Sequence, residues 1–140
     1  MTDTGANAAI PPGWKIQSFP DTFSAHAGPF WFRDDAEKEP GVGFLAEPRH
    51  ANAGGIVHGG ALLTLADMSL WDICRRAIGP FKAVTLTLNS EFLAPGRIGA
   101  FIVAVGEPLR IGKSLLFARG VVTAEGETLM SFSGTLKRFS

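Results

Sequence analysis

The sequence predicts an α+β protein in which one long helix lies against a curved antiparallel sheet. Three features of the 140-residue chain support this fold class. A helical apolar repeat runs over residues 59–78, four β-rich segments follow it, and the turns between those segments are short. Helix and strands are segregated along the chain, and this segregation is typical of α+β folds.

Length, composition and charge indicate one globular domain. Apolar residues make up 46% of the chain and charged residues 19%, a balance that excludes wholesale disorder. Thirteen basic and thirteen acidic residues cancel, so no strong electrostatic field favours nucleic acid or a membrane surface as a partner. We expect a flexible N-terminal tail over residues 1–13 and a single domain over residues 14–140.

The cysteine content and the absence of targeting signals favour a cytoplasmic protein. Cys74 is the only cysteine, so no intrachain disulfide can form, and a reducing compartment is the simplest interpretation. Residues 1–12 contain no Lys or Arg and no long apolar run, so they are not typical of a secretory signal. No stretch approaches the 18 or so unbroken apolar residues of a membrane-spanning helix.

The first part of the chain shows weaker patterns. Residues 14–32 are rich in aromatic side chains but follow no regular period, and Gly28-Pro29 is typical of a turn. The charged stretch 33–39 is typical of an exposed turn between two strands. We expect a strand over residues 42–47, ended by Pro48, and then a loop over residues 50–60 (HANAGGIVHGG), which carries four glycines.

The strongest pattern predicts a helix over residues 59–78, ended by Gly79-Pro80. Its expected buried face has the 3.6-residue period and contains Leu62, Leu65, Ala66, Ser69, Leu70, Ile73 and Ala77. The opposite face is also apolar, and Asp67 is the only charged residue between positions 61 and 71. We therefore expect other elements to wrap this helix. Cys74 should be a small buried apolar residue, and Asp72 should be exposed or paired with Arg75 or Arg76.

Four strands are predicted after the helix, over residues 83–93, 100–108, 114–124 and 128–139. The connections between them are short and carry Pro or Gly. Short connections favour antiparallel pairing of strands that follow one another along the chain. The prediction is therefore a sequential four-strand meander around the helix.

The common catalytic and nucleotide-binding motifs are absent from this sequence. There is no GxSxG, Walker loop, HExxH or GxGxxG. The three histidines and the single cysteine are too scattered for a zinc site, so no metal is predicted. These absences leave the loop-to-helix junction and Asp67 as the candidate site.

The junction has the chemistry of an oxyanion site. The backbone N–H groups of Gly59 and Gly60 lie at the helix start, where they lack intrahelical partners and where the helix dipole is positive. Such a site suits a carbonyl that becomes an oxyanion during acyl transfer. Asp67 lies eight residues later, about 12 Å along the helix axis. That is too far to act on the same carbonyl within one chain, whereas a second copy running antiparallel would bring its own Asp67 opposite these glycines.

Asp67 has apolar neighbours one turn away on each side, Leu63 and Trp71. A lone carboxylate there should be partly removed from water, which would raise its basicity. The alternative interpretation is that Asp67 lies at a solvent-accessible boundary between packed elements or makes a structural hydrogen bond to a strand.

The pattern Asn52-x6-Gly59-Gly60-x6-Asp67 resembles the signature of the PaaI-like branch of the hotdog-fold acyl-CoA thioesterases, within the 4-hydroxybenzoyl-CoA thioesterase superfamily. The resemblance extends from about residue 42 to residue 139 and includes the segment TLTLNSEFLAPGRIG after the helix. It implies a hotdog fold, with the sheet wrapped around the helix. It also implies hydrolysis of an acyl-CoA thioester to a carboxylic acid and CoA, with coenzyme A as part of the substrate and no separate cofactor.

The resemblance implies a role for each matching residue. Asp67 would be the nucleophile or the general base, Gly59 N–H would hold the thioester oxygen, and Asn52 would orient the water or the carboxylate of the facing subunit. The residues implied in substrate binding are His58, Gly60, Thr85 and Trp71. Those implied in CoA binding are Phe92, Arg97, Arg110, Lys113 and Ser114.

Several of these residues have an ordinary structural alternative. His58 would cap the loop, Thr85 would be an ordinary strand residue, Trp71 would be part of the core, and the charges of the turn would simply be solvated. Trp71-Asp72 is bulkier than expected of the family at this place, which would shorten the acyl pocket or favour a flat aromatic acyl group.

The resemblance also implies a homodimer, the double hotdog, with its sites at the subunit interface, and such pairs often assemble into tetramers. Two other functions stay open. One is a hydratase or dehydratase acting on 3-hydroxyacyl thioesters, but such enzymes carry a catalytic His on or near the helix. The other is a non-catalytic acyl-CoA-binding module, because fold does not guarantee function.

Overall fold

The computed structural model describes residues 10–139 except 18–20 and 35–37. Most of the predicted 1–13 tail, residues 1–9, lies outside the described residues. The elements in chain order are β1 (Lys15–Gln17), α2 (Thr22–Ala27), β2 (Phe30–Arg33), β3 (Gly41–Leu45), the 3-10 turn η1 (Pro48–His50), α3 (Gly59–Ile78), β4 (Lys82–Phe92), β5 (Phe101–Ile111), β6 (Leu115–Ala124) and β7 (Glu127–Phe139).

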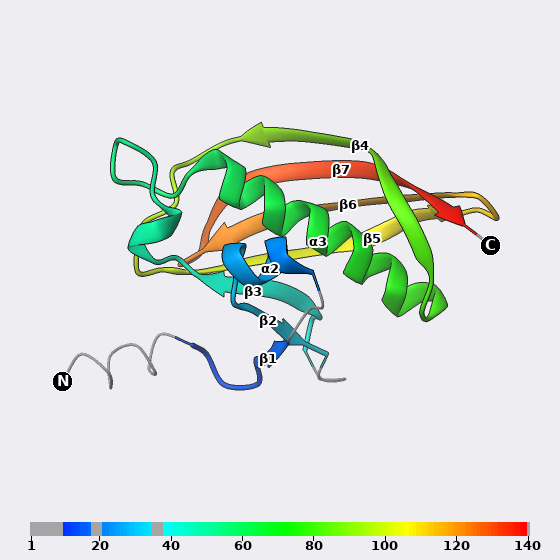
Figure 1. Ribbon diagram of the computed structural model, residues 1–140, viewed down its shortest axis with the longest axis horizontal. Helices are drawn as coiled ribbons and strands as arrows, with labels where there is room; N and C mark the ends of the chain where they lie inside the picture. The colour runs from blue at the N-terminus through cyan, green and yellow to red at the C-terminus, as the bar shows by residue number, and fades with distance from the viewer. Residues whose placement is uncertain (1–9, 18–20, 35–37, 140) are drawn as a thin grey trace.

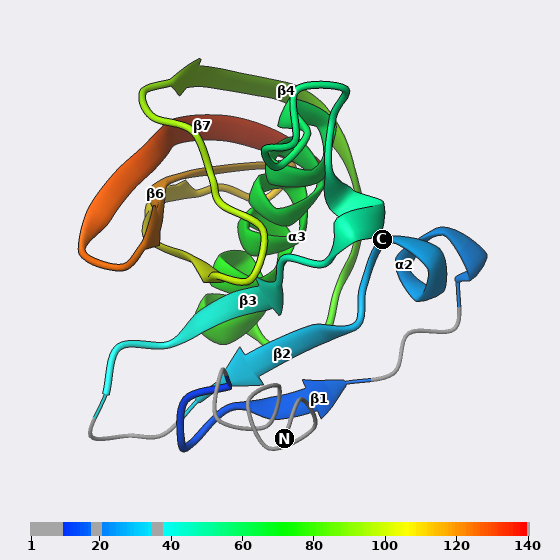
Figure 2. The ribbon, with the colours of Figure 1, turned by 90° about the vertical axis from the view of Figure 1, so that its left-hand side faces the viewer.

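The sheet is antiparallel throughout and curves around α3, as Figures 1 and 2 show. Its seven strands lie in the order β1-β2-β3-β5-β6-β7-β4. The α+β architecture and the helix at residues 59–78 are confirmed, and the predicted strands are present with ends shifted by up to three residues. The charged stretch after β2 connects two antiparallel neighbours, β2 and β3, as predicted.

The predicted sequential meander is wrong in one respect. β4 pairs with β7 and not with β5, while β3 occupies the place beside β5. Residues 93–100 connect β4 to β5 and can extend over about 26 Å at 3.3 Å per residue. Crossing three strand spacings needs only about 14 Å. The connection is therefore long enough to cross the end of the sheet, and β4 is left as an edge strand.

The aromatic segment 14–32 contains β1, α2 and β2, which its irregular pattern did not predict. Each of these elements is only 3 to 6 residues long, too short to establish a period. One local signal was present, because Asp21 is the N-cap of α2 and its carboxylate accepts the Ser24 N–H at 2.9 Å. The Ser24 hydroxyl donates to the same carboxylate oxygen, and these two bonds, led by that of the N–H, lower the pKa of Asp21.

The core lies between α3 and the inner face of the sheet. The predicted helix face is buried except for Ala77, which is exposed. Asp72 is also buried, and its two carboxylate oxygens accept from Arg75 at 2.9 Å and Arg76 at 2.8 Å. Cys74 is fully buried, as predicted, and burial raises the pKa of its thiol. Among the described residues, no helix is long and apolar enough to cross a membrane.

Glycine residues let α3 approach the sheet closely. A Cβ on Gly134 would lie 2.3 Å from Leu70 Cδ1 and 2.6 Å from the Thr87 carbonyl oxygen. A Cβ on Gly106 would lie 2.8 Å from Ile73 Cδ1. The side chains of α3 thus pack directly on the strand backbone, which fixes the height of the helix above the sheet.

We expect Gly134→Ala to destabilise the protein by about 1–3 kcal/mol, because the new methyl group would push both α3 and the β4 backbone outward. The free energy of unfolding in urea measures this cost. Ser133→Ala is the matched control, since Ser133 faces the outer side of the sheet, and its effect should stay within about 0.5 kcal/mol. A Gly134→Ala protein as stable as this control would contradict the close approach.

Candidate functional site

The start of α3 is capped by the side chain of His58. Its Nδ1 accepts the Gly60 N–H at 2.8 Å. A Cβ on Gly60 would lie 3.0 Å from this same nitrogen, so glycine is needed for the ring to reach the backbone. His58 thus has the capping role that the sequence left open, and the Gly60 N–H is already bonded within the chain.

Gly59 is the remaining donor at this junction. No acceptor among the described residues takes its N–H. The ring of exposed Phe92 lies beside it, 3.3 Å from where a Gly59 Cβ would stand. The two residues that the sequence assigned to the oxyanion site and to CoA binding are therefore neighbours, at the positive end of a 20-residue helix.

The side chain of Asn52 shapes the loop before the helix. Its Oδ1 accepts the N–H groups of Gly54 at 2.9 Å and Ile56 at 3.3 Å. This turn brings Ile56 back so that its carbonyl accepts the Asn52 N–H at 2.7 Å. The amide oxygen of Asn52 is therefore engaged in the loop, and only its NH₂ group is left for the orienting role that the resemblance implies.

Asp67 is exposed in the single chain, so the predicted removal of its carboxylate from water is wrong for one copy alone. The carboxylate does have one specific partner: Thr85 Oγ1 on β4 donates a hydrogen bond of 2.6 Å to Asp67 Oδ1. The sequence expected Thr85 to contact the acyl group or water, or to be an ordinary strand residue. The structure shows that its hydroxyl is bonded to the candidate catalytic carboxylate, and Thr85 also lines the hollow beside it.

A β-bulge directs Thr85 toward the helix. Thr85 pairs with Leu136, which is buried on the inner face, whereas Thr87 pairs with Thr135 on the outer face. The register shift between Thr85 and Thr87 separates two threonines that simple alternation would put on one face. This irregularity leaves no signal in the sequence.

A hollow of about 270 Å³ opens beside Asp67. It brings together three of the predicted site residues, Asp67, Thr85 and Trp71. The other lining residues were not predicted, and they are Ser24, Met68, Ala83 and Leu136. Ser24 was missed because α2 was missed. Within the described residues, no three His, Cys, Asp or Glu side chains gather closely enough to hold a metal ion.

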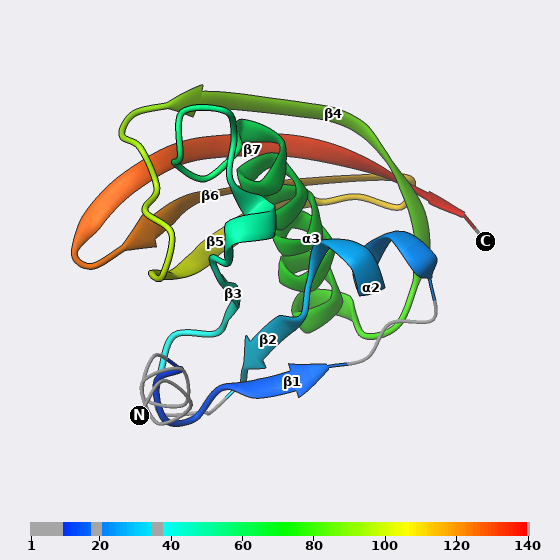
Figure 3. The same ribbon diagram turned by 60° about the vertical axis from the view of Figure 1, so that its left-hand side comes forward.

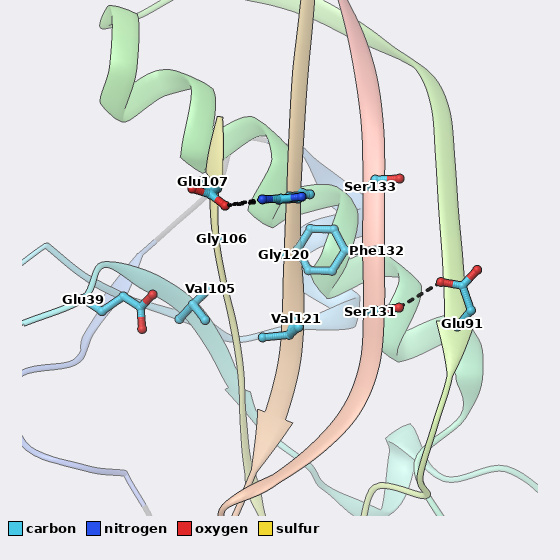
Figure 4. A pocket seen from close by; sticks show the side chains of 11 residues that line it. Glu39, Glu91, Val105, Gly106, Glu107, Gly120, Val121, Ser131, Phe132 and Ser133 are labelled. Carbon is cyan, nitrogen blue, oxygen red and sulfur yellow. Dashed lines mark hydrogen bonds and ion pairs between the residues drawn. The ribbon is translucent and has the colours of Figure 1, made fainter. Parts of the chain in front are cut away.

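A second hollow, of about 640 Å³, lies on the outer face of the sheet, on the side away from α3 (Figure 4). Four of its polar side chains form two pairs: Arg119 with Glu107 at 3.0 Å, and the Ser131 hydroxyl with Glu91 at 2.9 Å. None of the predicted site residues lines it. The hollow at Asp67, which brings together three of the predicted site residues, is therefore the better candidate site despite its smaller volume.

The residues implied in CoA binding lie at opposite ends of the sheet. Phe92 and Arg97 are near the start of α3, where Arg97 forms a β-bridge with Ile56. Arg110, Lys113 and Ser114 lie at the β5–β6 hairpin, at the other end in Figure 1. The ten residues of β6 span about 33 Å between the two ends.

The end of the sheet that carries the β5–β6 hairpin is rich in basic side chains. Lys113 and Ser114 line a hollow of about 800 Å³ there. Lys137, which donates to the Ser114 hydroxyl at 3.3 Å, lines it as well, as do Lys82 and Arg138. Arg97 and Arg110 are not among its lining residues.

Known proteins resemble this chain in both sequence and fold. The family model of the thioesterase superfamily matches residues 54–131. The PA0474 protein of Pseudomonas aeruginosa is 31% identical over 108 residues, which cover 76% of this chain and 81% of that protein. Acyl-coenzyme A thioesterase 13 of Mus musculus is 37% identical over 76 residues, and the match spans 51% of each chain.

Two solved structures extend the comparison. A mutant of the phenylacetic acid degradation protein PaaI from Thermus thermophilus has a TM-score of 0.72 and 27% identity, covering 85% of this chain and 100% of that one. BH2602 from Bacillus halodurans, solved with CoA, has a TM-score of 0.77 and 23% identity, and the match covers 89% of this chain and 82% of that one. The chain therefore belongs to the thioesterase superfamily, as a PaaI-like hotdog-fold thioester hydrolase.

Proposed function

We propose that this protein hydrolyses an acyl-CoA thioester to the free carboxylic acid and CoA, with Asp67 as the catalytic carboxylate. The observation that carries the proposal is the short Thr85–Asp67 hydrogen bond in a hollow whose other lining residues are mostly apolar. The similarity to acyl-coenzyme A thioesterase 13 and to a CoA-bound structure supports coenzyme A as the thiol part of the substrate.

The hydrogen bond from Thr85 determines which carboxylate oxygen can react. Oδ1 of Asp67 accepts from Thr85, so Oδ2 is the oxygen left to act on the substrate. Acting as a base, it takes a proton from a water molecule whose oxygen attacks the thioester carbon. Acting as a nucleophile, it attacks that carbon itself and forms a mixed anhydride, which water then hydrolyses.

The Gly59 N–H supports either route. It would donate to the carbonyl oxygen, which becomes an oxyanion when the tetrahedral intermediate forms. Collapse of that intermediate breaks the C–S bond, and the thiolate of CoA leaves and is protonated. The helix dipole behind Gly59 adds positive potential at the point where negative charge develops.

This chemistry needs two copies of the chain. Gly59 and Asp67 are about 12 Å apart along one helix. β4 is an 11-residue edge strand, and it exposes the apolar side chains of Val84 and Leu86 along its length and Phe92 at its end. An exposed, apolar edge strand is a surface that pairs with another strand. Antiparallel pairing of β4 with β4 of a second copy would set Gly59 and Phe92 of one subunit near Asp67 and Thr85 of the other.

The same pairing would join the two groups of CoA-binding candidates. A two-fold axis across β4 would bring the end that carries Arg97 in one subunit toward the basic hairpin end of its partner. A single CoA would then meet both groups, although they lie at opposite ends of one chain. The proposed functional unit is therefore a homodimer.

The histidines do not favour a hydratase-type reaction. Nδ1 of His58 is occupied by the helix cap. His50 is buried, and its two ring nitrogens bond to Glu47 N–H and to the Ala27 carbonyl. No histidine lines the hollow beside Asp67. No imidazole of the same chain therefore lines the hollow beside Asp67 to act as the general acid-base of 3-hydroxyacyl chemistry.

We expect Asp67→Asn to lower kcat by at least about 10²-fold, because the amide can neither take a proton nor attack. Release of free CoA, followed with a thiol reagent over a panel of acyl-CoAs, measures this effect. Glu107→Gln is the matched control, since it makes the same chemical change on an exposed carboxylate of the outer face. An Asp67→Asn protein with wild-type kcat would rule out the proposed mechanism.

Thr85→Val should lower kcat by about 10-fold or more with a smaller effect on KM, because a hydrogen bond to a charged group contributes about 1.5–3 kcal/mol. Thr85→Ser should restore most of the rate, since it keeps the hydroxyl. Thr87→Val is the control on the outer face. If Thr85→Ser is as slow as Thr85→Val, shape and not the hydrogen bond determines the role of this residue.

Complementation between two inactive variants tests the shared site. Gly59→Pro removes the N–H and preserves the helix start, because proline is favoured at the first helical position and the preceding His58 has a compatible extended backbone (φ −62, ψ 136). Gly59→Ala, which keeps the N–H and places a Cβ at the same 3.3 Å from the Phe92 ring, is the matched control. Gly59→Pro and Asp67→Asn homodimers should each lose at least about 10²-fold in kcat. Co-expressed as a heterodimer, the two chains should regain about half of the wild-type rate per dimer, since one site then holds both intact groups.

The rate of the heterodimer distinguishes a site built from groups of two chains from a site built within one chain. If each site used groups of one chain only, the heterodimer would be as inactive as either parent. Sedimentation equilibrium on the same samples reports the oligomeric state, and a monomeric yet active wild-type protein would contradict the dimer.

A further inference from the structure

We infer that His50 is a positioning residue for the proposed reaction, and that it holds the loop before α3 so that the Gly59 N–H is kept in place for the thioester oxygen. The inference rests on the proposed function and extends it to a residue that does not line the hollow beside Asp67. The sequence did not single out His50, which is one of three scattered histidines. The evidence is the set of bonds made by its buried ring and by its backbone carbonyl.

The ring of His50 is buried and bonded at both nitrogens. The residue is 6% exposed, and its ring packs edge to face on Phe44 of β3, with 4.8 Å between the centroids. Nδ1 accepts the Glu47 N–H at 2.9 Å, so the proton is on Nε2, which donates to the Ala27 carbonyl at 2.8 Å. Figure 3 shows this short turn after β3 beside α2 and below the loop that leads to α3. The ring therefore bonds η1 to the end of α2 and packs it on β3.

The backbone of His50 forms the base of the loop that leads to the helix. Its carbonyl accepts the His58 N–H at 2.8 Å. The next pair of residues, Ala51 and Val57, forms an antiparallel β-bridge. Residues 50–58 are therefore a small hairpin, with the buried His50 at one end and the helix cap His58 at the other.

His58 transmits this constraint to Gly59. Its N–H is bonded to His50, its carbonyl accepts the Ala61 N–H at 2.9 Å, and its ring accepts the Gly60 N–H at 2.8 Å. The peptide between His58 and Gly59, which carries the free N–H, lies between these bonds. Because a peptide unit is planar, bonds on both sides of it fix the direction of its N–H. Of these three bonds, the one to His50 comes from outside the helix.

The alternative is a purely structural role, in which the buried ring only stabilises the N-terminal segment. A structural role would weaken any chain that carries a change at His50. A positioning role affects only the active site that uses the Gly59 of that chain. Since the proposed dimer combines Gly59 of one subunit with Asp67 of the other, the two roles give different results when the change is placed in one chain or in its partner.

The first test compares two isosteres of the imidazole. Asparagine can place an oxygen where Nδ1 accepts the Glu47 N–H, whereas glutamine can place an NH₂ where Nε2 donates to Ala27. We expect His50→Gln to lower kcat at least about 10-fold with a smaller effect on KM, because a displaced donor stabilises the oxyanion less. His50→Asn should keep most of the rate, since it retains the bond that closes η1. Wild-type kcat in His50→Gln would overturn the inference.

His50→Phe supplies the same comparison if His50→Gln fails to fold. It keeps a flat ring against Phe44 and loses both hydrogen bonds. Its kcat should also fall at least about 10-fold relative to wild type.

The second test uses the heterodimer of the Gly59→Pro and Asp67→Asn chains. Its working site takes Gly59 from the Asp67→Asn chain and Asp67 from the Gly59→Pro chain. His50→Gln added to the Asp67→Asn chain should lower the rate of the heterodimer at least about 10-fold. The same change added to the Gly59→Pro chain should leave most of that rate, because the junction of that chain is not used.

A third measurement does not depend on activity. Nuclear magnetic resonance on protein labelled with nitrogen-15 glycine reports the amides of Gly59 and Gly60 together with that of the distant Gly134. In His50→Gln the Gly59 and Gly60 resonances should shift. The Gly60 amide hydrogen, which is bonded to His58, should also exchange faster with solvent, while Gly134 stays unchanged.

Arg49→Ala is the matched control for this measurement. Arg49 donates to the carbonyl of His26, so the change removes another bond between η1 and α2 but leaves the ring of His50 intact. The Gly59 resonance should therefore stay close to its wild-type position.

The possible failures are distinguishable. Unchanged Gly59 and Gly60 amides in both His50→Gln and His50→Phe would overturn the inference whatever the activity. Equal rates of the two substituted heterodimers would leave His50 a structural role only. A parent heterodimer that regains no activity would contradict the shared site, and no CoA release from any acyl-CoA would contradict the proposed function. In either case the amide measurement still decides the inference about His50.

Discussion

The close packing of α3 on the inner face of the sheet is the interaction on which the site depends. Leu70 lies where Gly134 lacks a side chain, and Ile73 lies in the same way over Gly106. Because protein interiors are packed at crystal-like density, these contacts leave little freedom in the height of the helix. Asp67, on the same helix, is thereby held within 2.6 Å of the Thr85 hydroxyl.

A second set of contacts joins α2, whose Ser24 lines the hollow beside Asp67, to the start of α3. The turn η1 holds α2 through His50 and Arg49, and the carbonyl of His50 accepts the N–H of His58 at 2.8 Å. His58 is the cap that orients the first turn of α3. The glycine junction and α2 are thus both bonded to one short 3-10 turn. The N-terminal segment therefore contributes to the candidate site through Ser24.

Predictions from the sequence agree with the structure for features that depend on a single helix or strand. The period of α3 is set by its own burial, so residues 59–78 were predicted with the observed ends. Asp67 was found because a charge interrupts an apolar pattern, and Gly59 because N–H groups at a helix start lack partners. Strand order was not predicted correctly. Periodicity shows which face of a strand is buried but not which strand lies beside it, so the exposed edge of β4 came only from the fold.

The sequence by itself determined the fold class, the long helix and the candidate site residues along it. The tertiary structure decided which groups meet them: Thr85 reaches Asp67 because a bulge turns it inward, and Ser24 lines the hollow because α2 folds back onto α3. It also decided that the implied CoA-binding residues lie at opposite ends of one chain. The physical reason is that local patterns record burial, whereas a site depends on register and on contacts between elements distant along the chain. A one-residue shift in register is enough to move a side chain to the other face of the sheet.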